Sequence, residues 1–345
     1  MVQSNVGVSA MLTSDIDITP PLQFVDNVTA PLLEWRRSGL GGVLATLVGI
    51  EGTSPRPLGS QMAINERGAW VGQISSDCAE AAIAREALSC LADGQARTVR
   101  YGRGSKFLDV RLPCGSGLDI HFDPHVPLEI LEDLEAARRA RTAVTLRWPD
   151  AGQSGTSAGH QLDWSPRHAG EINVESLIET GSGAYARHYL PVTRILVAGR
   201  GAHVSALISL AQATGLEVCL ASPDPQLVAR HSQHCVATQL LHQPDRFDVT
   251  PIDRWTATVL LFHDHDWEPG ILFQALRQDG FYVGALGSRA THKQRCERLA
   301  QLGVDSTSLS RVRGPVGLDI SAQSPPEIAV SIIAEILKAR RMAHV

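Results

Sequence analysis

Three blocks of sequence identify the architecture: FYVGALGSRATHKQR (residues 281–295), RGPVGLD (313–319) and SPPEIAVSIIAEI (324–336). The first block predicts a buried strand over 281–286 that ends in a Gly-Ser-Arg turn. The third block predicts a helix, because Ser324 can cap it, prolines occupy its first turn, and Glu327 stands three residues after the cap. Together with VAGRGAH at 197–203, these blocks predict the second half of a nucleotide-binding type of fold.

The pattern before and after residue 190 differs. After it, apolar strands alternate with helical segments, and this alternation predicts a parallel, doubly wound sheet. Before it, short strands, a hairpin turning at Gly68 and a helix ending at Gly94 predict a mixed domain. The sequence therefore predicts an α/β protein with a flexible tail (1–25), an N-terminal α+β domain (26–190) and a C-terminal Rossmann-like domain (191–345).

The composition is that of an ordinary soluble globular protein, with 345 residues, 43% hydrophobic and 19% charged. A formal net charge of -5 argues against nucleic acid as a partner, since such proteins present a basic face. Apolar runs are too short to span a membrane, and the N-terminus lacks the pattern of a secretion signal. Six cysteines without a C-x-x-C pair are expected to be reduced thiols, which favours a cytoplasmic location.

A glycine-rich turn, Gly199-Arg200-Gly201-Ala202-His203, follows a predicted strand and opens a helix. Gly199, Gly201 and His203 are candidate ligand contacts, since backbone N–H groups at a helix start can bind phosphate. The next strand ends in Ser222, without the acid that usually binds a ribose, and Asp224 follows a proline. Three interpretations stay open: NAD(P) binding, another phosphate ligand, or a structural turn.

A polar cluster, His263-Asp264-His265-Asp266, follows another buried strand. It should lie at the carboxyl edge of the parallel sheet, where ligands bind such folds. His263 is a candidate ligand contact. The cluster is a weak metal motif, and a polar loop is the alternative. Arg289 is a candidate anion contact, because it sits in a Gly-Ser turn and its guanidinium matches phosphate or carboxylate.

The predicted N-terminal domain contributes a loop, Gly52 to Ser60, in which Ser54, Arg56 and Gly59 could hold a phosphate-bearing ligand. Cys78 is expected in the first turn of a helix that Asp77 caps and Glu80 stabilises; the helix start favours its thiolate, while the nearby acids oppose it.

A second cysteine, Cys114, lies in the tight turn from Leu112 to Gly117. The alternative for Cys78 and Cys114 is that both are small buried residues of the core.

In this order, the blocks resemble the xanthine dehydrogenase accessory (XdhC/CoxI) family. The matching stretches are residues 52–62, 72–80, 112–117, 194–203, 281–289 and 313–335. The resemblance implies binding of the molybdenum cofactor, a pterin with a dithiolene and a terminal phosphate. It also implies protection of that cofactor during its terminal sulfuration, and transfer to a molybdenum hydroxylase.

The resemblance assigns roles to individual residues. Cys78 matches the family cysteine suspected of contacting the cofactor, which makes it the candidate metal ligand, and Cys114 matches the second. Arg56 matches the family's loop arginine, and Arg289 its Gly-Ser-Arg turn. One departure is that the family usually has Gly-Gly where this chain has Ser76-Asp77.

These observations predict a maturation factor rather than a turnover enzyme. Its cofactor would be molybdopterin or the cytosine dinucleotide form. Its partners would be a hydroxylase apoenzyme, a cysteine desulfurase that donates sulfur, and a second copy of the chain in a homodimer. One alternative is a Rossmann oxidoreductase that binds NAD(P) and uses His263 as acid or base. Another is a scaffold that only contacts the hydroxylase.

Overall fold

A computed structural model describes residues 27–105, 115–149, 159–164, 178–181, 183–243, 252–262 and 266–342. The chain divides into two units, one ending at Leu190 and the other beginning at Pro191. The predicted tail lies outside the described residues. Among the described residues, no helix combines the length and apolar composition that crossing a bilayer requires.

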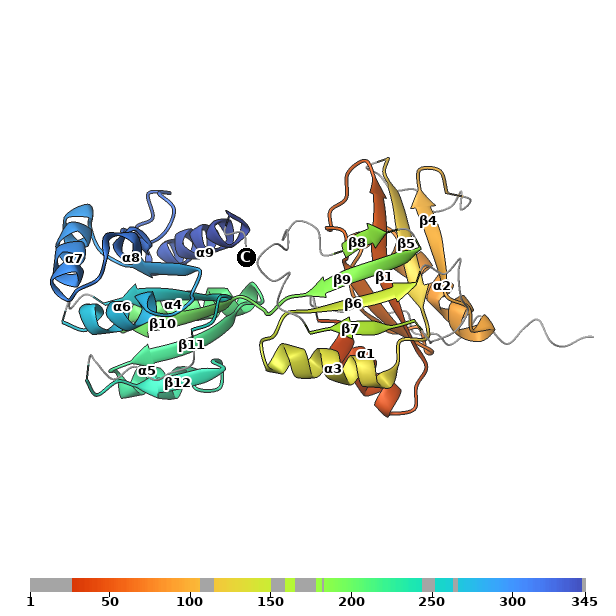
Figure 1. Ribbon diagram of the computed structural model, residues 1–345, viewed down its shortest axis with the longest axis horizontal. Coiled ribbons are helices and arrows are strands. Elements are labelled where there is room, and N and C mark those ends of the chain that lie inside the picture. The colour runs from red at the N-terminus through yellow and green to blue at the C-terminus, as the bar shows by residue number, and fades with distance from the viewer. Residues whose placement is uncertain are drawn as a thin grey trace, which may run out of the picture. The chain divides into compact units, whose positions relative to one another are not determined.

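The first unit is built on a five-stranded antiparallel sheet in the order β3-β2-β1-β5-β4. Figure 1 labels its strands β1, β4 and β5. Its strands are β1 (Gly42–Glu51), β2 (Gln61–Asn65), β3 (Trp70–Gly72), β4 (Arg97–Gly102) and β5 (Gly117–Asp123). The predicted hairpin is confirmed: β2 and β3 pair, and the Gly68 N–H donates to the Asn65 carbonyl. The long, buried β1 is the central strand.

Alternating side chains of β1 serve two cores, as expected of a strand covered on both faces. Val43, Ala45 and Leu47 pack with helix α2 (Glu80–Asp93). Leu44 packs with helices α1 (Thr29–Arg37) and α3 (Leu128–Arg139) on the other side.

A second antiparallel sheet, in the order β7-β6-β9-β8, also contributes to the first unit. Its strands are β6 (Val144–Pro149), β7 (Gln161–Asp163), β8 (Ile178–Gly181) and β9 (Ala184–Tyr189). Val48 of β1 packs with Trp148 and Tyr185 of this sheet. The second sheet therefore shares with α1 and α3 the face of the first sheet that α2 leaves open.

The second unit is a six-stranded parallel sheet in the order β12-β11-β10-β13-β14-β15. Figure 1 labels its strands β10, β11 and β12. The strands are β10 (Arg194–Gly199), β11 (Glu217–Ser222), β12 (Ala237–Leu240), β13 (Thr256–Leu261), β14 (Tyr282–Ala285) and β15 (Val312–Arg313). In chain order within the unit this is 3-2-1-4-5-6, the order of dinucleotide-binding folds. The predicted α+β and Rossmann-like architecture is confirmed.

Helices cover both faces of the parallel sheet. They are α4 (Ala202–Ala213), α5 (Pro225–His231), α6 (Glu268–Leu276), α7 (Arg289–Gln301), α8 (Ser306–Ser310) and α9 (Pro325–Met342). Val197 faces the core that α4 and α9 share, while Leu196 faces the core of α6 and α7. Successive residues of β10 thus point to opposite layers, which makes the sheet doubly wound.

Glu335 of α9 explains why the C-terminal blocks of sequence belong together. Its Oε2 accepts the backbone N–H of Gly317 at 2.7 Å and the hydroxyl of Tyr282 in β14. Gly317 has a φ of +100°, and a Cβ there would lie 2.3 Å from the Ser331 hydroxyl oxygen. The loop from β15 to α9 therefore needs glycine at this point and a carboxylate one helix turn beyond Ser331.

Candidate functional site at one edge of the antiparallel sheet

The antiparallel order brings several connections to one edge of the five-stranded sheet. Glu51, the last residue of β1, pairs with Gly117, the first of β5, and Gly117 also pairs with Gly102, the last of β4. Gly72 ends β3 beside Met62, close to the start of β2. The 52–60 loop, the segment that contains Cys78 and the turn before β5 all leave the sheet here. We call this end of the strands the loop edge.

Ser116 joins the 52–60 loop to the turn that precedes β5. Its hydroxyl accepts the Thr53 N–H at 3.2 Å and donates to the Thr53 carbonyl oxygen. Ser116 is only 1% exposed. These bonds place the predicted phosphate loop beside Ser116, which follows the second candidate cysteine by two residues in the sequence. Cys114 itself lies outside the described residues.

The far end of the 52–60 loop is held by the second sheet. Arg187 of β9 donates from Nε to the Gly59 carbonyl oxygen at 2.8 Å and lies 4.0 Å over the Tyr189 ring. Gly59 has a φ of +84°, and its N–H donates to Leu47 of β1. Within the loop, the Ser54 hydroxyl accepts the N–H of Arg56 at 3.2 Å. The loop is therefore fixed at both ends by buried groups.

Cys78 lies two residues before the start of α2, so its predicted placement in the first helical turn is wrong. Asp77 does not cap the helix: the N-terminal capping residue is Ala79, and its side chain has no oxygen. Instead, the buried Glu80 accepts the N–H groups of Ile74 and Ser75 at 3.0 and 2.6 Å. The carboxylate closes the segment into a turn, which holds the preceding residues outside the helix.

The Cys78 side chain is exposed, so it is not a buried residue of the core. Ser76 and Asp77 before it have φ angles of +55° and +72°, in the left-handed region that favours glycine. Ser76 and Asp77 therefore adopt a backbone conformation that suits the Gly-Gly pair expected from the resemblance, with side chains in place of hydrogen atoms. Cys90 and Cys219 are buried, as expected of structural residues.

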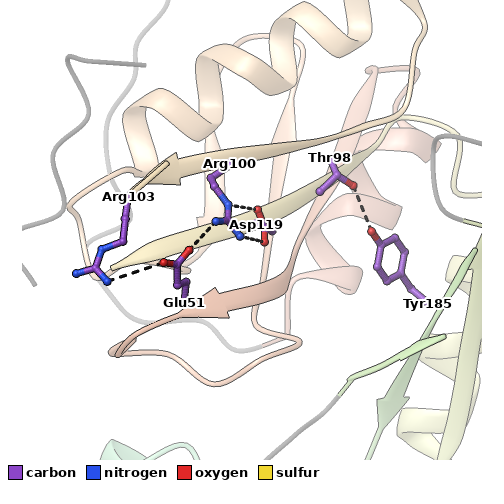
Figure 2. Close-up of polar contacts among 6 residues, drawn as sticks. All are labelled: Glu51, Thr98, Arg100, Arg103, Asp119 and Tyr185. Atoms are coloured by element: carbon purple, nitrogen blue, oxygen red, sulfur yellow. Dashed lines mark hydrogen bonds and ion pairs between the residues drawn. The ribbon is translucent and has the colours of Figure 1, made fainter. Parts of the chain in front are cut away.

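Four charged side chains form a network at the same edge (Figure 2). Arg100 of β4 donates to both carboxylate oxygens of Asp119 at 2.8 and 2.7 Å, and to Glu51 at 2.7 Å. Arg103, after β4, approaches the other Glu51 oxygen at 3.8 Å. The hydrogen bonds with Asp119 are the first cause of a raised pKa for Arg100. Arg100 thus stays charged between two acids.

Figure 2 also shows a contact deeper in the unit, where the hydroxyls of Thr98 in β4 and Tyr185 in β9 lie 3.4 Å apart. Thr98 also contacts the buried His121 ring at 3.1 Å. Tyr185 packs against His121 with ring centroids 5.2 Å apart. This cluster fixes the second sheet against the first, beneath the loop edge.

The second unit contains the other predicted residues. Gly199 ends β10 and packs so closely that a Cβ would lie 2.5 Å from the Leu261 carbonyl oxygen. Gly201 has a φ of +83° and open space around its Cβ position. His203 lies in the first turn of α4, and Arg289 is exposed at the start of α7, which Ser288 caps. His263 lies outside the described residues.

Asp224, the acid nearest the expected ribose position, caps α5 instead. Its Oδ1 accepts the N–H groups of Gln226 and Leu227 at 2.9 and 3.2 Å. Ser222, at the end of β11, is fully buried. The acid that followed the proline in sequence is therefore used for helix capping.

No group of three or more metal-ligating side chains forms within the described part of the chain. The assignment of Cys78 as a metal ligand stays a prediction.

Residues 35–102 match the XdhC and CoxI family, and residues 195–336 match the XdhC Rossmann domain. The molybdenum cofactor insertion chaperone PaoD of Escherichia coli (strain K12) is 33% identical over 88% of this chain and 85% of its own length. The chain belongs to the XdhC and CoxI family. The predicted family resemblance is thereby confirmed.

Two further proteins are similar over most of the chain. A probable xanthine dehydrogenase subunit from Bacillus subtilis (strain 168) is 26% identical over 88% of this chain and 94% of its own length. The crystal structure of a xanthine dehydrogenase from Bacillus halodurans superimposes with a TM-score of 0.71, at 22% identity, over 91% of this chain and 96% of that chain. This likeness shows that the two share a fold.

In this XdhC and CoxI chain, sequence reasoning missed the charged network of Glu51, Arg100, Arg103 and Asp119. A signal was present in Tyr101-Gly102-Arg103-Gly104, where glycines with φ of +78° and +75° flank an arginine. Such a turn presents the arginine at the end of a strand. The pairing of β4 with β5, which brings Arg100 beside Asp119, needs the tertiary structure.

Proposed function

We propose that this protein is a carrier and insertion chaperone for the molybdenum cofactor. One observation carries the proposal: the arginine- and hydroxyl-bearing 52–60 loop, the segment with the exposed Cys78 and the Arg103 turn all leave the sheet at the loop edge. The 33% identity to PaoD, which is named as such a chaperone, supports the same function.

The donor set at the loop edge suits this cargo. Arg56 and the loop amides would hold the terminal phosphate, because a guanidinium and backbone N–H groups are strong phosphate donors. Cys78 offers a soft sulfur ligand, which suits molybdenum or a transferable sulfur. The buried bonds of Ser116 and Arg187 would keep the loop in place before the cargo arrives. The role of the protein is then binding and shielding, without turnover.

The proposal extends to the partners. A molybdenum hydroxylase apoenzyme would receive the cofactor, and a cysteine desulfurase would donate the sulfur while the cofactor is bound. The cofactor would be molybdopterin or its cytosine dinucleotide form. The carrier would act as a cytoplasmic homodimer, with the Rossmann-like unit docking the hydroxylase.

The capping role of Asp224 weighs against the alternative, an NAD(P)-dependent oxidoreductase. A carboxylate that accepts two helix N–H groups is committed to the helix, and a ribose would have to compete for it. A titration with NAD(P)H that produced a saturable thermal shift would revive this alternative.

Cofactor binding by ultrafiltration tests the proposal. Wild type, Cys78→Ala and Cys296→Ala are each incubated with molybdopterin under anaerobic, reducing conditions. Cys296 is the control, a partly exposed thiol in the Rossmann-like unit. We expect saturable binding by wild type and Cys296→Ala, and weaker binding by Cys78→Ala. Equal binding by all three would remove Cys78 from the site, and no binding by wild type would reject the carrier function.

A further inference from the structure

We propose that Arg103 binds an anionic group of the ligand, and that Glu51 pairs with Arg103 until a phosphate takes its place. This inference rests on the proposed function and adds to it a contact that neither the sequence motifs nor the family resemblance supplied. The chemical class recognised is a phosphate or pyrophosphate ester.

The two arginines of the network differ in how firmly they are held. Arg100 makes three hydrogen bonds of 2.7 to 2.8 Å to Asp119 and Glu51, and its side chain is 36% exposed. The Arg103 side chain is 62% exposed, and its Nη1 lies 3.8 Å from the Glu51 oxygen, beyond hydrogen-bonding distance. Arg100 is therefore a structural residue. Among the described residues, the Arg103 guanidinium makes no hydrogen bond as short as those of Arg100, so it is the better candidate to donate to a ligand.

The backbone of Arg103 is fixed even though its side chain is exposed. Its N–H donates to the Ser116 carbonyl oxygen at 2.8 Å. Ser116 is the same residue that holds Thr53 of the 52–60 loop. One buried serine thus sets the position of Arg103 relative to the loop that contains Arg56, and a ligand would meet a prepared arrangement of donors.

The Arg103 guanidinium lies beside Gly115. A Cβ on Gly115 would have Arg103 Nη2 as its nearest atom, at 3.7 Å, and the residue has a φ of +66°. The guanidinium is therefore close to the backbone that leads into β5. Its planar fork can donate two parallel hydrogen bonds to phosphate oxygens.

The network can release Arg103 without leaving a carboxylate unpaired. Glu51 keeps its 2.7 Å bond to Arg100, which Asp119 holds from the other side. A phosphate at Arg103 would then replace a distant ion pair with a charge-assisted hydrogen bond. Because both side chains of the Glu51–Arg103 pair are largely exposed, separating them costs little.

Isothermal titration with inorganic pyrophosphate tests the inference on the full chain. Four proteins are compared: wild type, Arg103→Gln, Glu51→Gln and Arg67→Gln. Arg67 is the matched control. It is an exposed arginine in the β2–β3 hairpin, at the end of the strands opposite the loop edge. Thermal unfolding of each variant reports folding separately from binding.

We expect Arg103→Gln to raise the Kd for pyrophosphate by roughly ten- to hundredfold, as loss of a hydrogen bond between charged groups does. Glu51→Gln should lower the Kd by about two- to fivefold, since it removes the competing carboxylate. Arg67→Gln should leave it unchanged. An unchanged Kd in Arg103→Gln, a raised Kd in Glu51→Gln, or no pyrophosphate binding by wild type would each overturn the inference.

A parallel titration with molybdopterin separates this inference from the proposed function. Binding of both probes, with loss of both in Arg103→Gln, supports the two together. Molybdopterin binding that is equal in wild type and Arg103→Gln overturns the role of Arg103 and leaves the carrier function. Pyrophosphate binding that depends on Arg103, with no molybdopterin binding, supports the anion site and rejects the carrier function.

Discussion

Arg295 of α7 and Glu268 of α6 form an ion pair in which each side chain is only 2% exposed. Arg295 donates from Nε and Nη2 to the two carboxylate oxygens at 3.0 and 3.1 Å, and Nη2 also donates to the Leu286 carbonyl oxygen at 2.6 Å. The pair thus fixes the start of α6 to α7 and to the end of β14, at the carboxyl edge of the parallel sheet.

Glu268→Gln should lower the free energy of unfolding by about 3 kcal/mol, because it leaves a buried guanidinium without its counter-charge. The matched control is Glu132→Gln, whose partner Arg37 is 54% exposed; it should cost less than about 1 kcal/mol. Urea unfolding of both variants checks this. The double variant Glu268→Leu with Arg295→Met should recover part of the lost stability. Equal losses of stability in Glu268→Gln and Glu132→Gln would contradict the prediction.

Ser76→Gly and Asp77→Gly should each stabilise the protein, by about 0.5–1 kcal/mol, since a non-glycine residue in the left-handed region is strained. Ser76→Ala is the control, because alanine keeps the Cβ that causes the strain. Thermal and urea unfolding measure the effect. A gain in the alanine variant equal to that in the glycine variant would show that the backbone is not the cause.

Gly317→Ala should destabilise the protein by about 2 kcal/mol or more, through a strained φ and a clash with the Ser331 hydroxyl. Gly303→Ala isolates the clash. Gly303 has a similar φ of +88° but no atom within 4 Å of its Cβ position. The difference in urea midpoint between the two variants measures the loss of stability that the clash with Ser331 causes. Adding Ser331→Gly should partly restore the stability of Gly317→Ala but not that of Gly303→Ala.

Glu327 should make the stability depend on pH. The N–H groups of Gln323 and Ser324 lower its pKa below 4.5 in the folded state. A lowered folded pKa adds stability above the unfolded value, and this contribution disappears as the pH falls through the folded pKa.

The test compares the free energy of unfolding of Glu327→Gln with that of wild type over a range of pH. The variant should therefore be less stable at pH 7, with the difference shrinking toward pH 4 and below. Glu129→Gln, at an exposed glutamate in the first turn of α3, is the control. A difference independent of pH would exclude the charge as the cause.

The Rossmann-like unit could be predicted because its signals are local. Alternating apolar segments locate strands and helices, and Gly317 and Glu327 mark positions where the backbone or a cap restricts the residue type. The start of α2 could not be placed, because Glu80 forms bonds with residues up to six positions before it instead of completing a capping box. Which partners Glu80 bonds depends on the burial of its carboxylate in the folded protein, and a sequence motif gives no information about burial.

The candidate site was predictable only in parts. The sequence marked the loop around Arg56 and the segment around Cys78, since glycines, prolines and hydroxyls identify loops. It could not show that Ser116 joins that loop to the next turn, because residues 53 and 116 meet through the pairing of β1 with β5. Arg103 was missed for the same reason: its neighbours come from two other strands.

The antiparallel order of the first sheet separates selection for ligand binding, at one end of its strands, from selection for folding. Connections at the loop edge can change length and chemistry without altering the strand pairs below them, while the β2–β3 hairpin and the α2–β4 connection lie at the other end. Ligand preference can therefore diverge within a lineage at one end of the sheet while the remainder preserves foldability. A set of paralogues that serve different client enzymes should differ most in the residues that follow β1, β3 and β4.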